Sequence, residues 1–376
     1  MGFSAGWFAD RPGRIRSNIF EGYAMHAKIF FTILLGWLFV CGNAAAYKIN
    51  PLQNKYRQDS RTILRKASEP IHEEVTQLAR ACQQANAGPV LAALVCNDRS
   101  TPSKEPGGNK YDSLIRGVWW NDDPNQLLFA LRQAEFAAWM DDAKRIAVTG
   151  VNWKGRKATI GPDYNMTYRG HYGDLQFIHA MASEDGEPAQ VTQQNILDWA
   201  EFAFAVATGR LDPETKMNQA GPTRLQEYFE QQSGWTVNYL FAPKYRLKNA
   251  QYTRNMAAGS LLHMVQDSYA AAHSRRDFGA TARCPAGRVV QFYSYINQSP
   301  ELHADEDGRI AWQTGEFTGA QDPVNVSATL LAHIQQKTDW TTVRDYLRDI
   351  VFCVDDDVQD AGPGEFAAVR AMENSK

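Results

Sequence analysis

The segment Leu261–His273, which reads LLHMVQDSYAAAH, constrains this chain more than any other. It places His263, Asp267 and His273 in the pattern H-x3-D-x5-H among apolar and alanine residues. On an α-helix, residues four apart lie only about 40° apart around the axis, so His263 and Asp267 share one face. His273 lies about 80° away on the other side and could turn inward from the helix end. Two imidazoles that flank a carboxylate can hold zinc; the alternative is a buried helix that carries two hydrogen-bonded histidines.

The composition is that of an ordinary globular protein. The chain has 376 residues, of which 44% are hydrophobic and 22% charged, enough for one large domain or two ordinary ones. It has no internal repeat and no second composition regime, so we expect one mature domain over residues 47–376. The net charge is −3, so the composition shows no excess of basic residues of the kind that is typical of nucleic-acid-binding proteins.

The N-terminal residues have the pattern of a secretion signal. Lys28 precedes the apolar run Ile29–Val40, and Ala44–Ala46 supplies the small residues of a cleavage site. The run is short for a membrane span, which takes about 20 residues. We therefore expect residues 1–46 to be a signal peptide, with Met25 as an alternative start, and the mature protein to be secreted or periplasmic.

Four cysteines remain after such a cleavage: Cys82, Cys96, Cys284 and Cys353. An even number in an exported protein indicates two disulfides, with three possible connectivities. We favour Cys82–Cys96 with Cys284–Cys353, because the first pair is close in sequence and brackets one loop.

Helical periodicity dominates the rest of the chain, and it predicts a mainly α fold. The helical segments are expected at about 68–82, 126–144, 175–181, 191–208, 223–232, 251–272, 327–337 and 340–351. Residues 97–113 have loop composition, 117–124 indicate a sharp break, and the acidic tail after Asp355 is expected to be loose at its end. Residues 145–168 differ in kind, since apolar residues and glycines there predict a small β-hairpin insertion.

Histidines and acids recur along the chain in a recognisable order. His72 stands at a helix start, Trp120, Asn121 and Asp122 form a W-x-D element, His179 follows Phe177 and Ile178, and His303 and Asp307 form a second H-x3-D pair downstream of the central motif. This order, over residues 72–307, resembles the zinc-dependent phospholipase C family and its relatives, the single-strand nucleases. The central motif matches completely, whereas H-x3-D at His303 is the form of the nuclease branch.

The resemblance implies a multi-helix domain with two to three zinc ions in one cleft. The first ion would be held by Asp122, His179, His263 and Asp267. The second would be held by His273, His303 and Asp307, and the third by His72 with Asp122. Zinc would activate a water molecule for attack on phosphorus, and Asp122 would orient or deprotonate that water.

Two neighbouring residues remain alternatives. Asp123 could replace Asp122 as a ligand or base. His171 could replace His179, although the helix-start pattern after His179 fits better; His171 would then support the ligands or contact the phosphate. Trp119, Trp120 and Trp153 could contact a membrane or a choline headgroup, although core packing is commoner for a tryptophan pair.

The chain also departs from the family pattern. The family's ligating N-terminal tryptophan is absent between Tyr47 and His72, and Ala272 stands where a proline is expected before His273. We expect a phospholipase C that acts on phospholipid at a membrane surface, releasing diacylglycerol and a phosphorylated headgroup, with no stable protein partner. The alternatives are a secreted single-strand nuclease or nucleotidase, for which nucleic acid would be the substrate, and a non-catalytic relative whose metal site has decayed.

Overall fold

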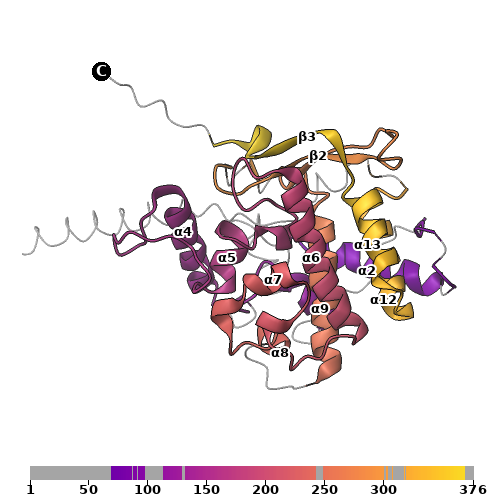
Figure 1. Cartoon of the computed structure of the whole chain (residues 1–376), viewed down its shortest axis with the longest axis horizontal. Helices are drawn as coiled ribbons and strands as arrows, with labels where there is room; N and C mark the ends of the chain where they lie inside the picture. The colour runs from indigo at the N-terminus through magenta and orange to yellow at the C-terminus, as the bar shows by residue number, and fades with distance from the viewer. Residues whose placement is uncertain are drawn as a thin grey trace, which may run out of the picture. The chain divides into compact units, whose positions relative to one another are not determined.

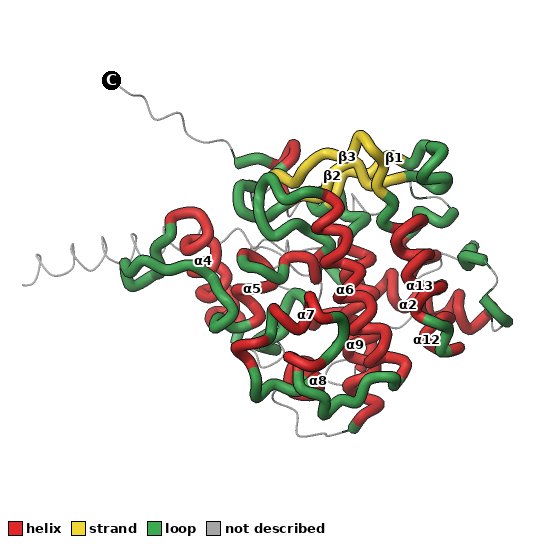
Figure 2. The backbone as a smooth tube through the Cα atoms, viewed as in Figure 1, coloured by secondary structure: helices red, strands yellow, loops and turns green. Residues whose placement is uncertain are grey.

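Helix α9 (Ala250–Asp267) lies at the centre of the computed structural model and contacts α2, α3, α6, α8 and α12 (Figure 1). The structure describes residues 69–368 except 87, 91, 98–112, 129–131, 243–248, 300–301, 304–306, 308–316 and 318. All of the described residues belong to one compact unit, Gly42–Lys376. The predicted mainly helical fold with a small β element is confirmed (Figure 2). The expected signal peptide and the segment around Tyr47 lie outside the described residues.

The elements have the following bounds. The remaining α-helices are α2 (Ile71–Ala85), α3 (Ser113–Trp120), α4 (Gln133–Thr149), α5 (Met166–Tyr172), α6 (Ala189–Thr208), α7 (Thr223–Glu227), α8 (Val237–Phe241), α12 (Pro323–Gln336) and α13 (Trp340–Tyr346). The 3-10 helices are η4 (Gln176–His179), η5 (Met217–Gln219), η6 (Glu230–Gln232) and η8 (Gly364–Phe366), and η7 (Leu347–Val351) is a π-helix that continues α13. The strands are β1 (Ser274–Asp277), β2 (Arg288–Tyr293) and β3 (Val354–Gly362).

From Met256 to its C-terminal end, helix α9 is buried on every side. The side chain of Asn249 accepts a hydrogen bond from the backbone N–H of Gln251 and so caps its N-terminus. Every residue from Met256 to Asp267 is buried. A helix with no solvent face must satisfy its polar side chains inside the protein, because an unpaired buried polar group is costly. Its buried histidine and aspartate therefore need partners or a ligand.

Gly117 lies inside α3, which continues to Trp120, so the sharp break predicted at 117–124 begins four residues too early. A Cβ atom at Gly117 would lie 2.4 Å from the carbonyl oxygen of Met256 in α9. Gly259 of α9 is equally confined, since its Cβ would lie 2.3 Å from the carbonyl oxygen of Leu114. These glycines let two helix backbones touch, which is a packing requirement and not a turn signal.

The β-hairpin predicted for residues 145–168 is present but much shorter than predicted. Helix α4 continues to Thr149, and α5 begins at Met166. Between them, Val151 and Lys157 form one isolated antiparallel bridge. The backbone N–H groups of Asn152 and Ala158 donate to the carbonyls of Arg156 and Gly150 across this bridge. The side chain of Asn152 accepts hydrogen bonds from the backbone N–H groups of Lys154 and Arg156 and closes the turn.

The sheet instead follows α9 directly. Strands β1 and β2 pair antiparallel, and β3 joins the other edge of β2 in parallel, with register shifts in both pairings. The acidic segment after Asp355 forms most of β3, and its end, which was expected to be loose, lies outside the described residues. Figure 2 shows this sheet at one edge of the helical body.

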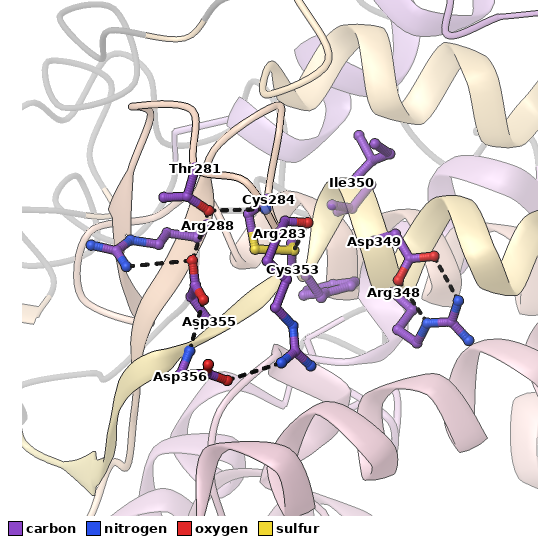
Figure 3. The surroundings of a disulfide bond; sticks show 12 residues. Thr281, Arg283, Cys284, Arg288, Arg348, Asp349, Ile350, Cys353, Asp355 and Asp356 are labelled. Carbon is purple, nitrogen blue, oxygen red and sulfur yellow. Dashed lines mark hydrogen bonds and ion pairs between the residues drawn. A yellow bond between two sulfur atoms is a disulfide. The ribbon is translucent and has the colours of Figure 1, made fainter.

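Both predicted disulfides are present, Cys82–Cys96 and Cys284–Cys353. The second joins the β1–β2 connection to the residue that precedes β3 (Figure 3). Beside it, Thr281 donates to Asp355 at 2.7 Å, and Arg283 pairs with Asp356 at 3.1 Å. The disulfide thus holds the edge strand against the sheet. Among the described residues, no helix combines the length and hydropathy that a membrane span requires.

Candidate metal centre

The central pair predicted from the sequence lies on one buried face of α9. The Nε2 atom of His263 is 2.9 Å from Oδ2 of Asp267. The Nδ1–H of His263 donates to the backbone carbonyl of Val118 in α3, at 2.6 Å. Because a carbonyl can only accept, the proton sits on Nδ1 and the lone pair of Nε2 faces the carboxylate. This is the tautomer that a metal ligand needs.

Other histidines of the site are fixed in the same way. His171 donates Nδ1–H to the carbonyl of Thr167 at 2.9 Å, and His273 donates to the carbonyl of His179 at 2.8 Å. Each of these imidazoles keeps Nε2 as its acceptor nitrogen. The backbone of α5 and η4 thus presents the Nε2 atoms in a form that can bind a cation.

Two glutamines orient the remaining outer histidines. Nδ1 of His72 lies 2.6 Å from the side-chain oxygen of Gln266, whose amide donates to Thr76 and Ser327. Nδ1 of His303 lies 2.6 Å from the side-chain oxygen of Gln298. Since both amide groups are engaged elsewhere, their oxygens face the imidazoles and select the same tautomer. The sequence analysis missed both glutamines, because single amides at irregular spacing carry no ligand signal.

Asp122 enters the site from the turn that follows α3. The preceding residue, Asn121, donates to the carbonyls of Ile178 and Ser260 at 2.6 and 3.2 Å and so joins this turn to η4 and α9. Asp122 is 3% exposed, and neither of its oxygens has a hydrogen-bond partner among the described residues. Oδ1 lies 3.9 Å from Nε2 of His263. A bound cation would offset the free-energy cost of burying these two carboxylate oxygens without hydrogen bonds.

His179 connects the two halves of the centre. Its Nδ1 is 2.8 Å from Oδ2 of Asp267 and 3.2 Å from Nε2 of His263. Its Nε2 is buried and has no hydrogen-bond partner among the described residues. On the other side of Asp267, Nε2 of His72 lies 3.1 Å from Oδ1. One carboxylate of α9 is therefore in contact with three imidazoles from three separate elements.

A further set lies at the C-terminal end of α9. Nε2 of His303 is 2.9 Å from Oδ2 of Asp307, four residues later. Nε2 of His273 is 3.8 Å from Oδ1 of the same aspartate. His303 lies next to Leu302, which is 46% exposed, so this end of the centre is close beneath the surface.

Four buried groups have ligand atoms within 4.8 Å of one another and could hold a metal ion. They are His72, Asp122 and His263; Asp122, His171 and His179; His179, His263 and Asp267; and His273, His303 and Asp307. The structure thus brings together all eight residues that the sequence analysis named as ligands. His171, named there as an alternative to His179, joins the site beside it. Asp123 lies in none of these groups: its oxygens accept hydrogen bonds from the backbone N–H groups of Leu127 and Leu128 and cap a turn.

Burial sets the charge state of the centre. It lowers the pKa of His72 to about 4 and the pKa of His263 to about 3, so these imidazoles are neutral at pH 7. Burial, and then the neighbouring Asp267, raises the pKa of the Asp122 carboxyl well above its usual range. Among the described residues, neither Asp122 nor Asp267 pairs with a lysine or arginine. Neutral nitrogen donors around uncompensated carboxylates suit a divalent cation.

Tyr295 is a site residue that the sequence analysis missed. Its ring lies 4.8 Å from that of His303 and 5.7 Å from that of His273. The hydroxyl group is buried without a hydrogen-bond partner among the described residues. Burial, followed by the carboxylates of Asp267 and Asp307, raises the pKa of this phenol well above its usual value, so it keeps its proton. No periodicity in the sequence marks this residue, which arrives through the turn after β2.

Comparisons of the chain with models of protein families, with curated proteins and with solved structures find no significant match.

Proposed function

We propose that this chain is an exported, zinc-dependent hydrolase of phosphodiester bonds, of the phospholipase C type, related to the family that its histidine pattern resembles. The observation that carries the proposal is the convergence of His72, Asp122, His179, His263, Asp267, His273, His303 and Asp307 in one buried centre. These residues come from five separate stretches of the chain. Scattered structural histidines would have no reason to meet around shared carboxylates.

Zinc fits the donor set better than the other common divalent ions. Every ligand atom is an imidazole nitrogen or a carboxylate oxygen, whereas magnesium and calcium prefer oxygen alone. His179, His263 and Asp267 would hold one ion with Asp122, and His273, His303 and Asp307 would hold a second. His72, Asp122 and His263 would hold a third. When bound, zinc would supply Lewis-acid chemistry, acidifying water and stabilising negative charge on a phosphoryl group.

The residues of the chain would perform the remaining tasks. Asp122, with two free oxygens, would orient a water molecule and accept its proton. The hydrogen bonds from Nδ1 to carbonyl or amide oxygens would keep the imidazoles from rotating as charge develops. A decayed site would not be expected to keep this supporting shell, so we favour an active enzyme over a non-catalytic relative.

Export and a lipid substrate are supported by separate features. The two disulfides are typical of proteins from oxidising compartments, as expected for a secreted or periplasmic protein. The net charge of −3 does not favour a polyanionic substrate. Trp120, which could have stacked on a base, is buried and donates its Nε1–H to the carbonyl of Leu240. We therefore place the phospholipase above the nuclease.

One comparison of substrates tests the proposal. The protein is loaded with zinc and incubated with phosphatidylcholine dispersions and with single-stranded DNA. We expect release of diacylglycerol and phosphocholine, and no release after treatment with EDTA. Cleavage of DNA without lipid hydrolysis would replace the phospholipase by the nuclease, and stoichiometric zinc without either activity would reject both.

A further inference from the structure

The end of α4 and the loop after it carry an unusual exposed surface, which we call the α4 tip (Val148 and residues 150–158). Trp153 is 65% exposed and Val148 is 54% exposed, and they are the most exposed large hydrophobic side chains of this part of the chain. In Figure 1, α4 lies at the left edge of the view, away from the β-sheet. An exposed tryptophan is uncommon on a surface that has only water to contact.

The α4 tip is held in one conformation by its own hydrogen bonds. The backbone N–H of Trp153 donates to Oδ1 of Asp142 at 2.6 Å. Asn152 accepts from two N–H groups of the loop and donates its own backbone N–H to the carbonyl of Arg156 at 2.9 Å. Gly150 adopts a positive φ of 67° and ends α4, which turns the chain back. A loop that is fixed by hydrogen bonds therefore holds the indole in contact with solvent.

Basic side chains surround the exposed apolar residues. The stretch from Ala143 to Pro162 contains no acidic residue, although Asp142 precedes it and Asp163 follows it, and it contains these bases: Lys144, Arg145, Lys154, Arg156 and Lys157. Arg145 and the three bases of the loop are exposed. The ammonium group of Lys154 lies 4.9 Å from the centre of the Trp153 ring. This local positive charge stands out in a chain whose net charge is −3.

We propose that the α4 tip docks on the surface of bilayers that contain anionic phospholipid. An indole belongs at the level of the headgroups, where its ring is buried and its N–H stays hydrated. Lysine and arginine beside it are attracted to anionic headgroups, and their aliphatic stems extend along the apolar surface. Single-stranded nucleic acid would instead need several aromatic rings in a row along a groove, whereas Trp153 is the one aromatic residue of the tip.

The α4 tip is physically joined to the candidate metal centre. Asp142, which fixes Trp153 through Oδ1, also accepts a hydrogen bond through Oδ2 from the hydroxyl of Tyr168 at 3.2 Å. Tyr168 lies in α5, one turn before His171 of the centre. This inference rests on the proposed function, because docking here would hold the metal centre next to a lipid substrate.

Cosedimentation with vesicles tests the inference on the full mature protein. Binding is measured to vesicles of pure phosphatidylcholine and to vesicles that also contain about 30% phosphatidylglycerol, each at low and at high salt. The test variants are Trp153→Ala and the double variant Arg156→Glu, Lys157→Glu. The control is Tyr239→Ala, which removes another exposed aromatic side chain, 48% exposed, far from the tip in sequence. Thermal unfolding shows that each variant is folded.

We expect binding that requires phosphatidylglycerol, weakens with salt, and falls about tenfold or more in both test variants but not in Tyr239→Ala. Equal binding by wild type and test variants, or equal binding with and without phosphatidylglycerol, would overturn the inference. The inference would also be overturned if the wild type bound oligo(dT) but not vesicles, and the same variants lost the binding of oligo(dT).

Hydrolysis of the soluble ester bis(p-nitrophenyl) phosphate separates this inference from the proposed function. The test variants should keep wild-type rates on this ester while they lose vesicle binding. A wild type that binds vesicles but does not hydrolyse any phosphodiester would leave the docking surface intact and reject the proposed enzyme.

Discussion

A Cβ atom on Gly259 of α9 would lie 2.5 Å from the backbone carbonyl carbon of Gly117 in α3. At this crossing the two helices are in direct backbone contact. Four residues after Gly259, His263 donates to the carbonyl of Val118, and Asp122 stands two residues after the end of α3. The distance between the two helices therefore sets the distance between Asp122 and the histidine of the central motif.

Substitution Gly259→Ala should damage both stability and metal binding. The added methyl group has no room, so α3 must move away, at a cost of about 2–3 kcal/mol in the free energy of unfolding. The same movement carries Asp122 away from His263 and should lower zinc affinity. Urea unfolding and zinc titration measure the two effects. Gly234→Ala is the matched control, since a Cβ there meets nothing within 4 Å; equal effects at both glycines would refute this account.

Removal of a central ligand should abolish the proposed activity. His263→Ala and Asp267→Ala each remove a side chain that is in contact with other predicted ligands. We expect activity at least about a hundredfold below wild type and less bound zinc after dialysis. Elemental analysis and phosphodiester hydrolysis are the measurements. His333→Ala changes a histidine outside the four ligand groups, whose Nδ1 lies 3.1 Å from the hydroxyl of Thr338, and this variant should keep its zinc. Wild-type turnover in either ligand variant would count against the centre.

The metal-free protein should lose stability on acidification. Burial lowers the pKa of His72 and of His273 to about 4, so between pH 6.5 and about 4 the unfolded chain binds protons that the folded chain does not. Stability then falls as the pH falls, by up to about 3 kcal/mol for each such histidine. The raised pKa values of Asp122 and Asp267 act in the opposite direction, but the histidines outnumber them.

Urea unfolding of EDTA-treated protein at pH 7, 6 and 5 checks this dependence. The stabilisation that added zinc gives should also be larger at pH 7 than at pH 5, because protons compete for the imidazoles. A metal-free protein that is as stable at pH 5 as at pH 7 would show that these histidines are not held neutral.

Substitution Tyr295→Phe should leave the bound metal unchanged. Burial raises the pKa of this phenol in the metal-free protein, so its conversion to a phenolate ligand at neutral pH would cost free energy that the histidine and aspartate ligands do not require. Its hydroxyl also has no hydrogen-bond partner among the described residues, so its loss should not lower the melting temperature. Zinc content and thermal unfolding test both statements. Loss of zinc in this variant would make Tyr295 a ligand and contradict the assignment.

The long helices were predictable because their periodicity reflects burial on one side or in the core. The segments near α6, α9 and α12 were located to within a few residues. The errors arose where long-range contact decides the local structure. Gly117 is helical because α9 lies against it, and Val354–Gly362 is a strand because β2 pairs with it. A single sequence does not show that α9 packs against Gly117 or that β2 pairs with this strand.

The candidate centre was predictable to a greater degree than the sheet. Metal ligands are restricted to a few residue types, and two pairs at i, i+4 spacing mark helical faces. The supporting residues were not predictable, since Gln266, Gln298 and Tyr295 act only through contacts made by the fold. His171 was undervalued because sequence order alone could not tell whether one or both histidines of that region face Asp122.

Asp122 belongs to two of the four ligand groups, one with His72 and one with His171. A carboxylate shared in this way makes the filling of one group change the affinity of the other. Successive ions should therefore enter with unequal, mutually dependent dissociation constants, and the dependence must be reciprocal. Because two cations that share one carboxylate repel each other, the second group should fill at a higher free metal concentration than the first, and a partly loaded protein should exist between the two.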